Sequence, residues 1–126
     1  MLQRSLVMAA AWLEIVAGTV FVTAINIVCG VLFAVKPEAV VMVFGRFAGI
    51  ALFALGITCM PSRVTGPLRK AALGLFVLNA GLAILLAWVG VATTLRGRLL
   101  WPAIGLHAAI AAALLPQLLA RHDSKA

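Results

Sequence analysis

A single arginine, Arg46, lies inside an apolar run at residues 40–60 that is long enough to cross a bilayer as a helix. A guanidinium group keeps its charge, so at membrane depth it needs polar partners or water. Counting from the connecting loops at ~1.5 Å per residue places Asn26 and His107 at a similar depth in neighbouring spans. We therefore predict an intramembrane polar layer of Asn26, Arg46 and His107, in which Asn26 and a neutral His107 accept hydrogen bonds from Arg46. The alternatives are a purely structural network that fixes helix register, or an Arg46 side chain that extends to the headgroups.

Glu14 is the second candidate, because it is the one carboxylate inside an apolar run. It lies 23 residues before Pro37, which corresponds to ~35 Å along a straight helix and places it near the inner surface of the membrane. One interpretation is a hydrated carboxylate at the interface, close to basic residues of the inner loops and tail. The other is a buried carboxylate that exchanges protons. The basic residues near it in the first interpretation are Arg69, Lys70 and Arg121.

The residues around Glu14 carry a local resemblance. The stretch 11–19, AWLEIVAGT, resembles the first helix of the small multidrug resistance transporters. Those are short four-span proteins with an essential membrane glutamate in that helix. The resemblance implies a proton-coupled small-molecule transporter in which Glu14 carries the proton. The chain departs from the family in having no tyrosine.

Composition decides the fold class. The 126 residues are 65% hydrophobic and 10% charged, which leaves too little polar surface for a soluble domain of this size. Apolar runs at 10–35, 40–60, 71–95 and 99–119 each approach the ~20 residues that cross the hydrocarbon core. We predict an all-α polytopic membrane protein, residues 1–126 forming a single domain of four transmembrane helices in a bundle.

The net charge is +7, and most of the basic residues lie in or beside the connections between the apolar runs. An even number of spans puts both termini and the second loop on one side, and this side has more basic residues than the other. The positive-inside rule then predicts that both termini are cytoplasmic. Because topology accounts for these charges, we expect no nucleic-acid partner. The basic residues on the inner side are Arg4, Arg63, Arg69, Lys70, Arg121 and Lys125, and those on the outer side are Lys36, Arg96 and Arg98.

Further residues within the runs suggest packing rather than chemistry. Small residues at helical spacing, such as Gly45, Gly49 and Gly56, predict close contact between helices. Asn79 is expected to form an interhelical hydrogen bond. Nucleophile–base pairs, phosphate loops and metal-ligand spacings are missing from the sequence, so we expect no enzyme, no cofactor and no metal site.

A second resemblance extends over most of the chain. It is carried by Lys36-Pro37-Glu38, by FGRFAG at 44–49, by Asn79-Ala80-Gly81 and by LLWPA at 99–103 followed by His107. In this order the chain resembles a group of small, uncharacterised four-span bacterial membrane proteins that are loosely DoxX-like. The resemblance implies a multi-pass protein of the bacterial inner membrane.

Two functions follow as expectations. The first is a non-enzymatic accessory, scaffold or small-ligand-binding module, in contact with the lipid bilayer and with a membrane-protein partner. The alternative is the proton-coupled small-molecule transporter, acting as a homodimer because four short helices enclose little volume.

Overall fold

The computed structural model describes residues 2–62 and 68–119 and consists of four helices over those ranges. They are α1 (Leu2–Phe33), α2 (Ala39–Cys59), α3 (Leu68–Ala92) and α4 (Leu100–Leu119). Each helix is long and apolar enough to cross a membrane. The chain is thus an all-α polytopic membrane protein, as the composition predicts. Arg63, Arg121 and Lys125, used above to predict orientation, lie outside the described residues.

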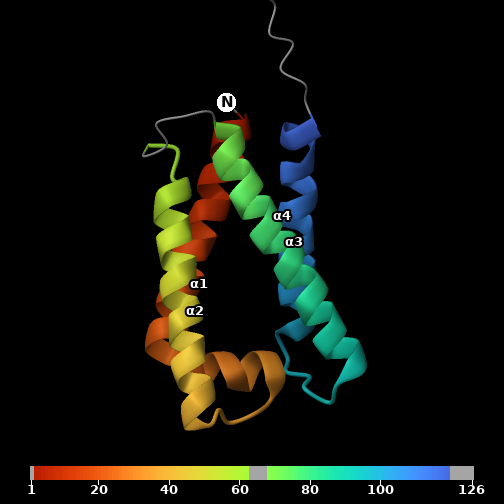
Figure 1. Cartoon of the computed structure of the whole chain (residues 1–126). Helices are drawn as coiled ribbons and strands as arrows, with labels where there is room; N and C mark the ends of the chain where they lie inside the picture. The colour runs from red at the N-terminus through yellow and green to blue at the C-terminus, as the bar shows by residue number, and fades with distance from the viewer. Residues whose placement is uncertain (1, 63–67, 120–126) are drawn as a thin grey trace, which may run out of the picture.

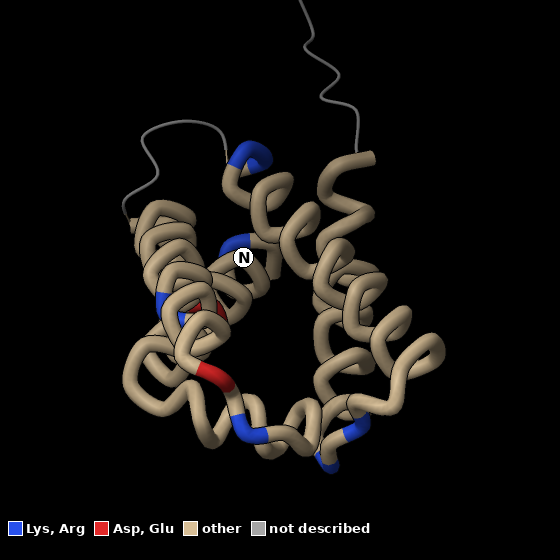
Figure 2. The backbone as a smooth tube through the Cα atoms, turned by 60° about the horizontal axis from the view of Figure 1, so that its bottom comes forward, with Lys and Arg blue, Asp and Glu red and all other residues tan. Residues whose placement is uncertain are grey.

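The helices form two antiparallel hairpins, α1 with α2 and α3 with α4 (Figure 1). The start of α1, the end of α2, the start of α3 and the end of α4 lie at one end of the molecule. The predicted spans 40–60, 71–95 and 99–119 agree with α2, α3 and α4, since their ends differ by three residues or fewer. Basic residues lie toward both ends of the bundle (Figure 2).

The first helix differs from the prediction. It begins at Leu2 and bends at Ala24, where φ is −136° and ψ is 37°. After the bend, residues 25–33 run across the end of the molecule, and we name them the foot segment (Figure 1). The hydroxyl of Thr23 donates to the carbonyl of Thr19 over 2.8 Å, a side-chain bond that competes with the backbone ladder and favours bending.

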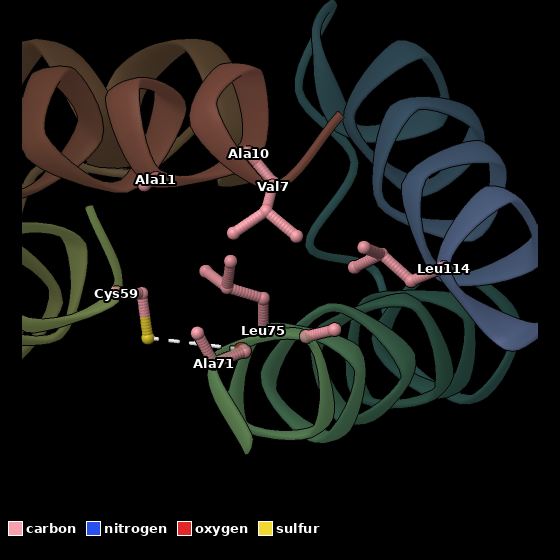
Figure 3. Packing of buried hydrophobic residues seen from close by; sticks show 8 residues of the cluster. Val7, Ala10, Ala11, Cys59, Ala71, Leu75 and Leu114 are labelled. Atoms are coloured by element: carbon pink, nitrogen blue, oxygen red, sulfur yellow. Dashed lines mark hydrogen bonds between the residues drawn. The ribbon is translucent and has the colours of Figure 1, made fainter. Parts of the chain in front are cut away.

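All four helices meet at the end that holds Leu2. Cys59 and Leu75 lie in a cluster with residues of α1 and α4, and the Cys59 thiol donates to the carbonyl oxygen of Ala71 over 3.7 Å (Figure 3). Because half of the buried residues of this cluster are alanines, the helices can approach closely there, which is how helices associate in lipid. The buried members of this cluster are Val7, Ala10, Ala11, Cys59, Ala71, Ala72, Leu75 and Leu114.

At the opposite end the hairpins are joined through the backbone. The amide of Gly97 donates to the carbonyl oxygen of Leu32 over 2.8 Å, and the amide of Leu99 donates to the carbonyl oxygen of Val31 over 2.9 Å. The loop between α3 and α4 is therefore fixed to the foot segment. A Cβ atom at position 97 would overlap the carbonyl oxygen of Val31 and lie 2.5 Å from the carbonyl carbon of Leu32.

We expect Gly97→Ala to lower the free energy of unfolding by about 2 kcal/mol, because the added methyl group displaces the loop and breaks both hydrogen bonds. Unfolding in mixed detergent micelles, followed by circular dichroism, measures the change. Gly30→Ala is the matched control, since no described residue outside the same turn of helix has an atom within 4 Å of a Cβ atom at that position. Equal stability of the two variants would show that the loop is not held by these bonds.

Candidate functional site

Three polar side chains, each from a different helix, form one hydrogen-bonded chain inside the bundle. Glu14 of α1 and Asn79 of α3 are fully buried, with 0% of each residue exposed. The Asn79 amide nitrogen donates to Oε1 of Glu14 over 3.0 Å and to the carbonyl of Leu75 over 2.9 Å. His107 of α4 lies on the other side, with Nδ1 2.7 Å from Oδ1 of Asn79. His107 itself is half-buried, and we name Glu14, Asn79 and His107 together the buried triad after its two fully buried members.

The geometry of Asn79 assigns the hydrogens of the triad. An amide nitrogen has two hydrogens, and both are used, one toward Glu14 and one toward Leu75. The amide oxygen can only accept, so Nδ1 of His107 must carry the hydrogen between them. In the neutral imidazole this leaves Nε2 as an acceptor. Asn79 is therefore polarised in one direction, donating to the carboxyl group and accepting from the imidazole.

The carboxyl group of Glu14 is only half satisfied. Its Oε2 atom is buried and has no hydrogen-bond partner among residues 2–62 and 68–119. An ionised carboxylate in an apolar environment is costly unless it is paired and fully hydrogen-bonded. Glu14 thus combines a buried acidic oxygen that is free to bind a proton with a second oxygen that is held in place.

The triad lies in the middle of the bundle rather than at a surface. Glu14 is 12 residues after the start of α1 and 10 before the bend at Ala24, or about 18 and 15 Å along the helix. Asn79 is 11 residues after the start of α3 and 13 before its end. His107 is 7 residues after the start of α4 and 12 before its end.

These positions correct the predicted depths. The prediction placed Glu14 near the inner surface by counting back from Pro37 along a straight helix, which is wrong because the chain turns at Ala24. Residues 25–33 add sequence length without adding depth, so Glu14 lies deeper within the bundle than the count implied.

The predicted polar layer is not assembled as a layer. Within the described part of the chain His107 is hydrogen-bonded to Asn79, whereas the prediction paired it with Arg46. Asn26 and Arg46 are both exposed on the surface of the first hairpin. Asn26 follows the bend and belongs to the foot segment, so it lies nearer to the end of the bundle than the straight-helix count placed it. The prediction that Asn79 bonds between helices is confirmed.

The sequence analysis did not include Asn79 among the candidate functional residues, because it assigned Asn79 only to an interhelical hydrogen bond. The signal that would have found the triad is position within each helix. Asn79 and His107 each fall in the middle part of their own span, which the sequence shows, whereas Glu14 does so only because α1 starts at Leu2 and turns at Ala24, a bend that the structure reveals.

The described residues hold no group of three or more His, Cys, Asp or Glu side chains able to bind a metal ion. The two cysteines, Cys29 and Cys59, are buried and unpaired. The chain thus has the architecture of a small multi-pass membrane protein with a buried polar triad at its centre. Comparisons with protein-family models, with curated proteins and with solved structures find no match to it.

Proposed function

We propose that the protein is a proton-coupled membrane transporter of small molecules in which Glu14 binds and releases the proton. The observation that carries this proposal is the fully buried Glu14, with one oxygen held by Asn79 and the other without a partner in the described residues. Ionisable groups inside membrane spans most often belong to ion pathways or proton relays. The proposal agrees with the resemblance of residues 11–19 to the first helix of the small multidrug resistance transporters.

The chemistry suggests the substrate class. When Glu14 is protonated the buried site is neutral, and when it releases the proton it carries an uncompensated negative charge. A small lipophilic cation can neutralise that charge and replace the proton. Asn79 keeps the carboxyl group oriented in both states, because the amide can donate to a carbonyl oxygen or to a carboxylate oxygen.

The test is proton release on addition of a lipophilic cation, with tetraphenylphosphonium as the probe. In weakly buffered detergent solution we expect stoichiometric release from the native chain and none from Glu14→Gln, since a glutamine cannot hold the proton. Glu38→Gln is the matched control, because Glu38 lies at the N-terminal end of α2 outside the helix and should leave release unchanged. Reconstitution in liposomes then asks whether an imposed pH gradient drives uptake of the cation.

A second function is favoured by the surface of α2. Phe44 and Phe47 are 69% and 65% exposed, and the buried residues of α2 are the small Gly49, Gly56 and Cys59. Such a surface suits an accessory or scaffold module that covers it with another membrane protein. Failure of every cation to release protons, together with a stable complex in mild detergent, would support this non-enzymatic role instead.

We further propose that the chain lies in a bacterial inner membrane with both termini in the cytoplasm, and that it belongs with the DoxX-like four-span proteins. The distribution of basic residues and the order of motifs support these assignments. Cysteine-accessibility labelling at Glu38 and Lys70, which lie toward opposite ends of the bundle, tests the orientation.

A further inference from the structure

Two cavities lie along the seam between α1 and α2. The first, which we name the seam groove, has a volume of about 300 Å³ and is lined by Gly18, Thr19, Val22, Thr23, Ile50 and Phe53. The second, which we name the loop pocket, has a volume of about 540 Å³ and is lined by Asn26, Ile27, Lys36, Pro37 and Met42. Neither contains a residue of the buried triad.

The two cavities follow one another along the same hairpin. On α1, the residues of the seam groove precede the bend at Ala24 and those of the loop pocket follow it. On α2, Met42 lines the loop pocket, whereas Ile50 and Phe53 line the seam groove. Residues three and four apart share a helix face. The spacing 42, 46, 50, 53 therefore puts Arg46 on this same face, one turn from Met42 and one turn from Ile50.

The chemistry changes sharply along this path. In the seam groove the hydroxyls of Thr19 and Thr23 donate to backbone carbonyls of their own helix, so the lining is apolar apart from satisfied groups. In the loop pocket Lys36 and Asn26 are exposed. Arg46 is also exposed, on the same face of α2 and one turn further along the helix than Met42. Lysine and arginine have hydrogen-bond donors and no acceptors, so the polar end is suited to an anion.

The other charges at this end do not cancel that preference. Glu38 lies beyond Pro37 at the start of α2 and is the one acidic residue there among the described residues. Arg96 and Arg98 lie in the loop between α3 and α4, which is bonded to the foot segment (Figure 2). An anionic group in the loop pocket therefore lies in a net positive environment at the surface of the membrane.

We propose that this path binds an anionic phospholipid, with its phosphate group in the loop pocket and one acyl chain in the seam groove. The distance along α2 from Arg46 to Phe53 is about 10 Å, enough to hold the upper part of an acyl chain. The order of the two cavities, polar at the end of the bundle and apolar toward its middle, matches the orientation of a lipid in the bilayer. The site also gives Asn26 and Arg46 a role that the buried triad does not.

The experiment uses the full chain in detergent and native mass spectrometry with added dioleoyl phosphatidylglycerol or dioleoyl phosphatidylcholine. We expect phosphatidylglycerol to be retained about tenfold more tightly than phosphatidylcholine. Arg46→Gln and Lys36→Gln should each weaken the binding of phosphatidylglycerol about tenfold. Lys70→Gln removes a basic residue at the other end of the bundle and should change nothing. Equal retention of both lipids, or an unchanged Arg46→Gln variant, would overturn the proposal.

Two further arms separate the lipid from other occupants. Thr19→Leu fills the seam groove and should weaken the binding of phosphatidylglycerol, although it leaves the basic residues unchanged. Inorganic phosphate and glycerophosphoglycerol, which lack acyl chains, should not displace the lipid at equal concentration. Displacement by either would make the site one for a soluble anion. A dimer that Thr19→Leu abolishes would make a second copy of the chain the occupant, and both results would contradict a lipid site.

Discussion

Replacing Asn79 with leucine is expected to lower the free energy of unfolding by about 2 kcal/mol. Asn79 is the one residue of the buried triad that contacts both of the others, and leucine has a similar size but cannot hydrogen-bond. The change therefore leaves Oε1 of Glu14 and Nδ1 of His107 without their partner inside the bundle. Interhelical hydrogen bonds in membranes average ~0.6 kcal/mol, so most of the expected loss comes from the two abandoned groups.

The measurement is the unfolding midpoint in mixed detergent micelles, with Asn26→Leu as the control. Asn26 is exposed on the foot segment, so the same chemical change there should alter stability by less than about 0.5 kcal/mol. If Asn79→Leu were as stable as Asn26→Leu, the hydrogen bonds of the triad would contribute nothing to the fold. A destabilised Asn79→Leu chain that still released protons on cation binding would separate the structural role of Asn79 from the function of Glu14.

Replacing Gly18 with valine is expected to cost about 3 kcal/mol and to separate α1 from α2. A Cβ atom at Gly18 would lie 2.5 Å from the backbone nitrogen of Phe53 and 2.6 Å from the carbonyl oxygen of Gly49. Both contacts are with backbone atoms of α2, which cannot move aside as a flexible side chain can. The whole helix must shift, and the dispersion contacts that replace the hydrophobic effect in lipid are then lost along the seam.

Gly81→Val and Gly105→Val are the matched controls, because in residues 2–62 and 68–119 no atom outside the same turn of helix lies within 4 Å of a Cβ atom at either position. Unfolding in mixed micelles measures the loss of stability. Crosslinking between cysteines introduced on the facing surfaces of α1 and α2 measures their separation. Equal crosslinking in the native chain and in Gly18→Val would contradict close backbone packing between these helices.

The helices themselves could be predicted from the sequence because their lengths and composition reflect the bilayer. Lys36-Pro37 and Arg96-Gly97-Arg98 interrupt the apolar sequence and so divide it into runs. The helices α2, α3 and α4 begin and end within three residues of the predicted runs. Small residues gave part of the packing correctly. A Cβ atom at Gly49 or Gly56 would meet backbone atoms of α1 at less than 3 Å, whereas at Gly81 or Gly105 it would meet no atom of the described residues outside its own turn of helix within 4 Å.

The site could be predicted only in its parts. Glu14, Asn79 and His107 were each recognised as polar residues within apolar runs, but their partners depend on depth, and depth depends on the course of α1. The bend at Ala24 arises from a local backbone conformation and a threonine hydrogen bond, and no proline or glycine marks it in the sequence. Without the bend, counting residues puts Asn26 beside His107; with it, Asn79 takes that place.

The most direct test is a dipolar distance measurement by solid-state NMR between the side-chain carboxyl carbon of glutamate and the side-chain amide nitrogen of asparagine. The chain has two glutamates, Glu14 and Glu38, and two asparagines, Asn26 and Asn79, so labelling by residue type is nearly site-specific. In lipid bilayers we expect the strong coupling of directly hydrogen-bonded groups, lost in Asn79→Ser and kept in Asn26→Ser. A coupling that is missing, or that survives in Asn79→Ser, would contradict the buried triad.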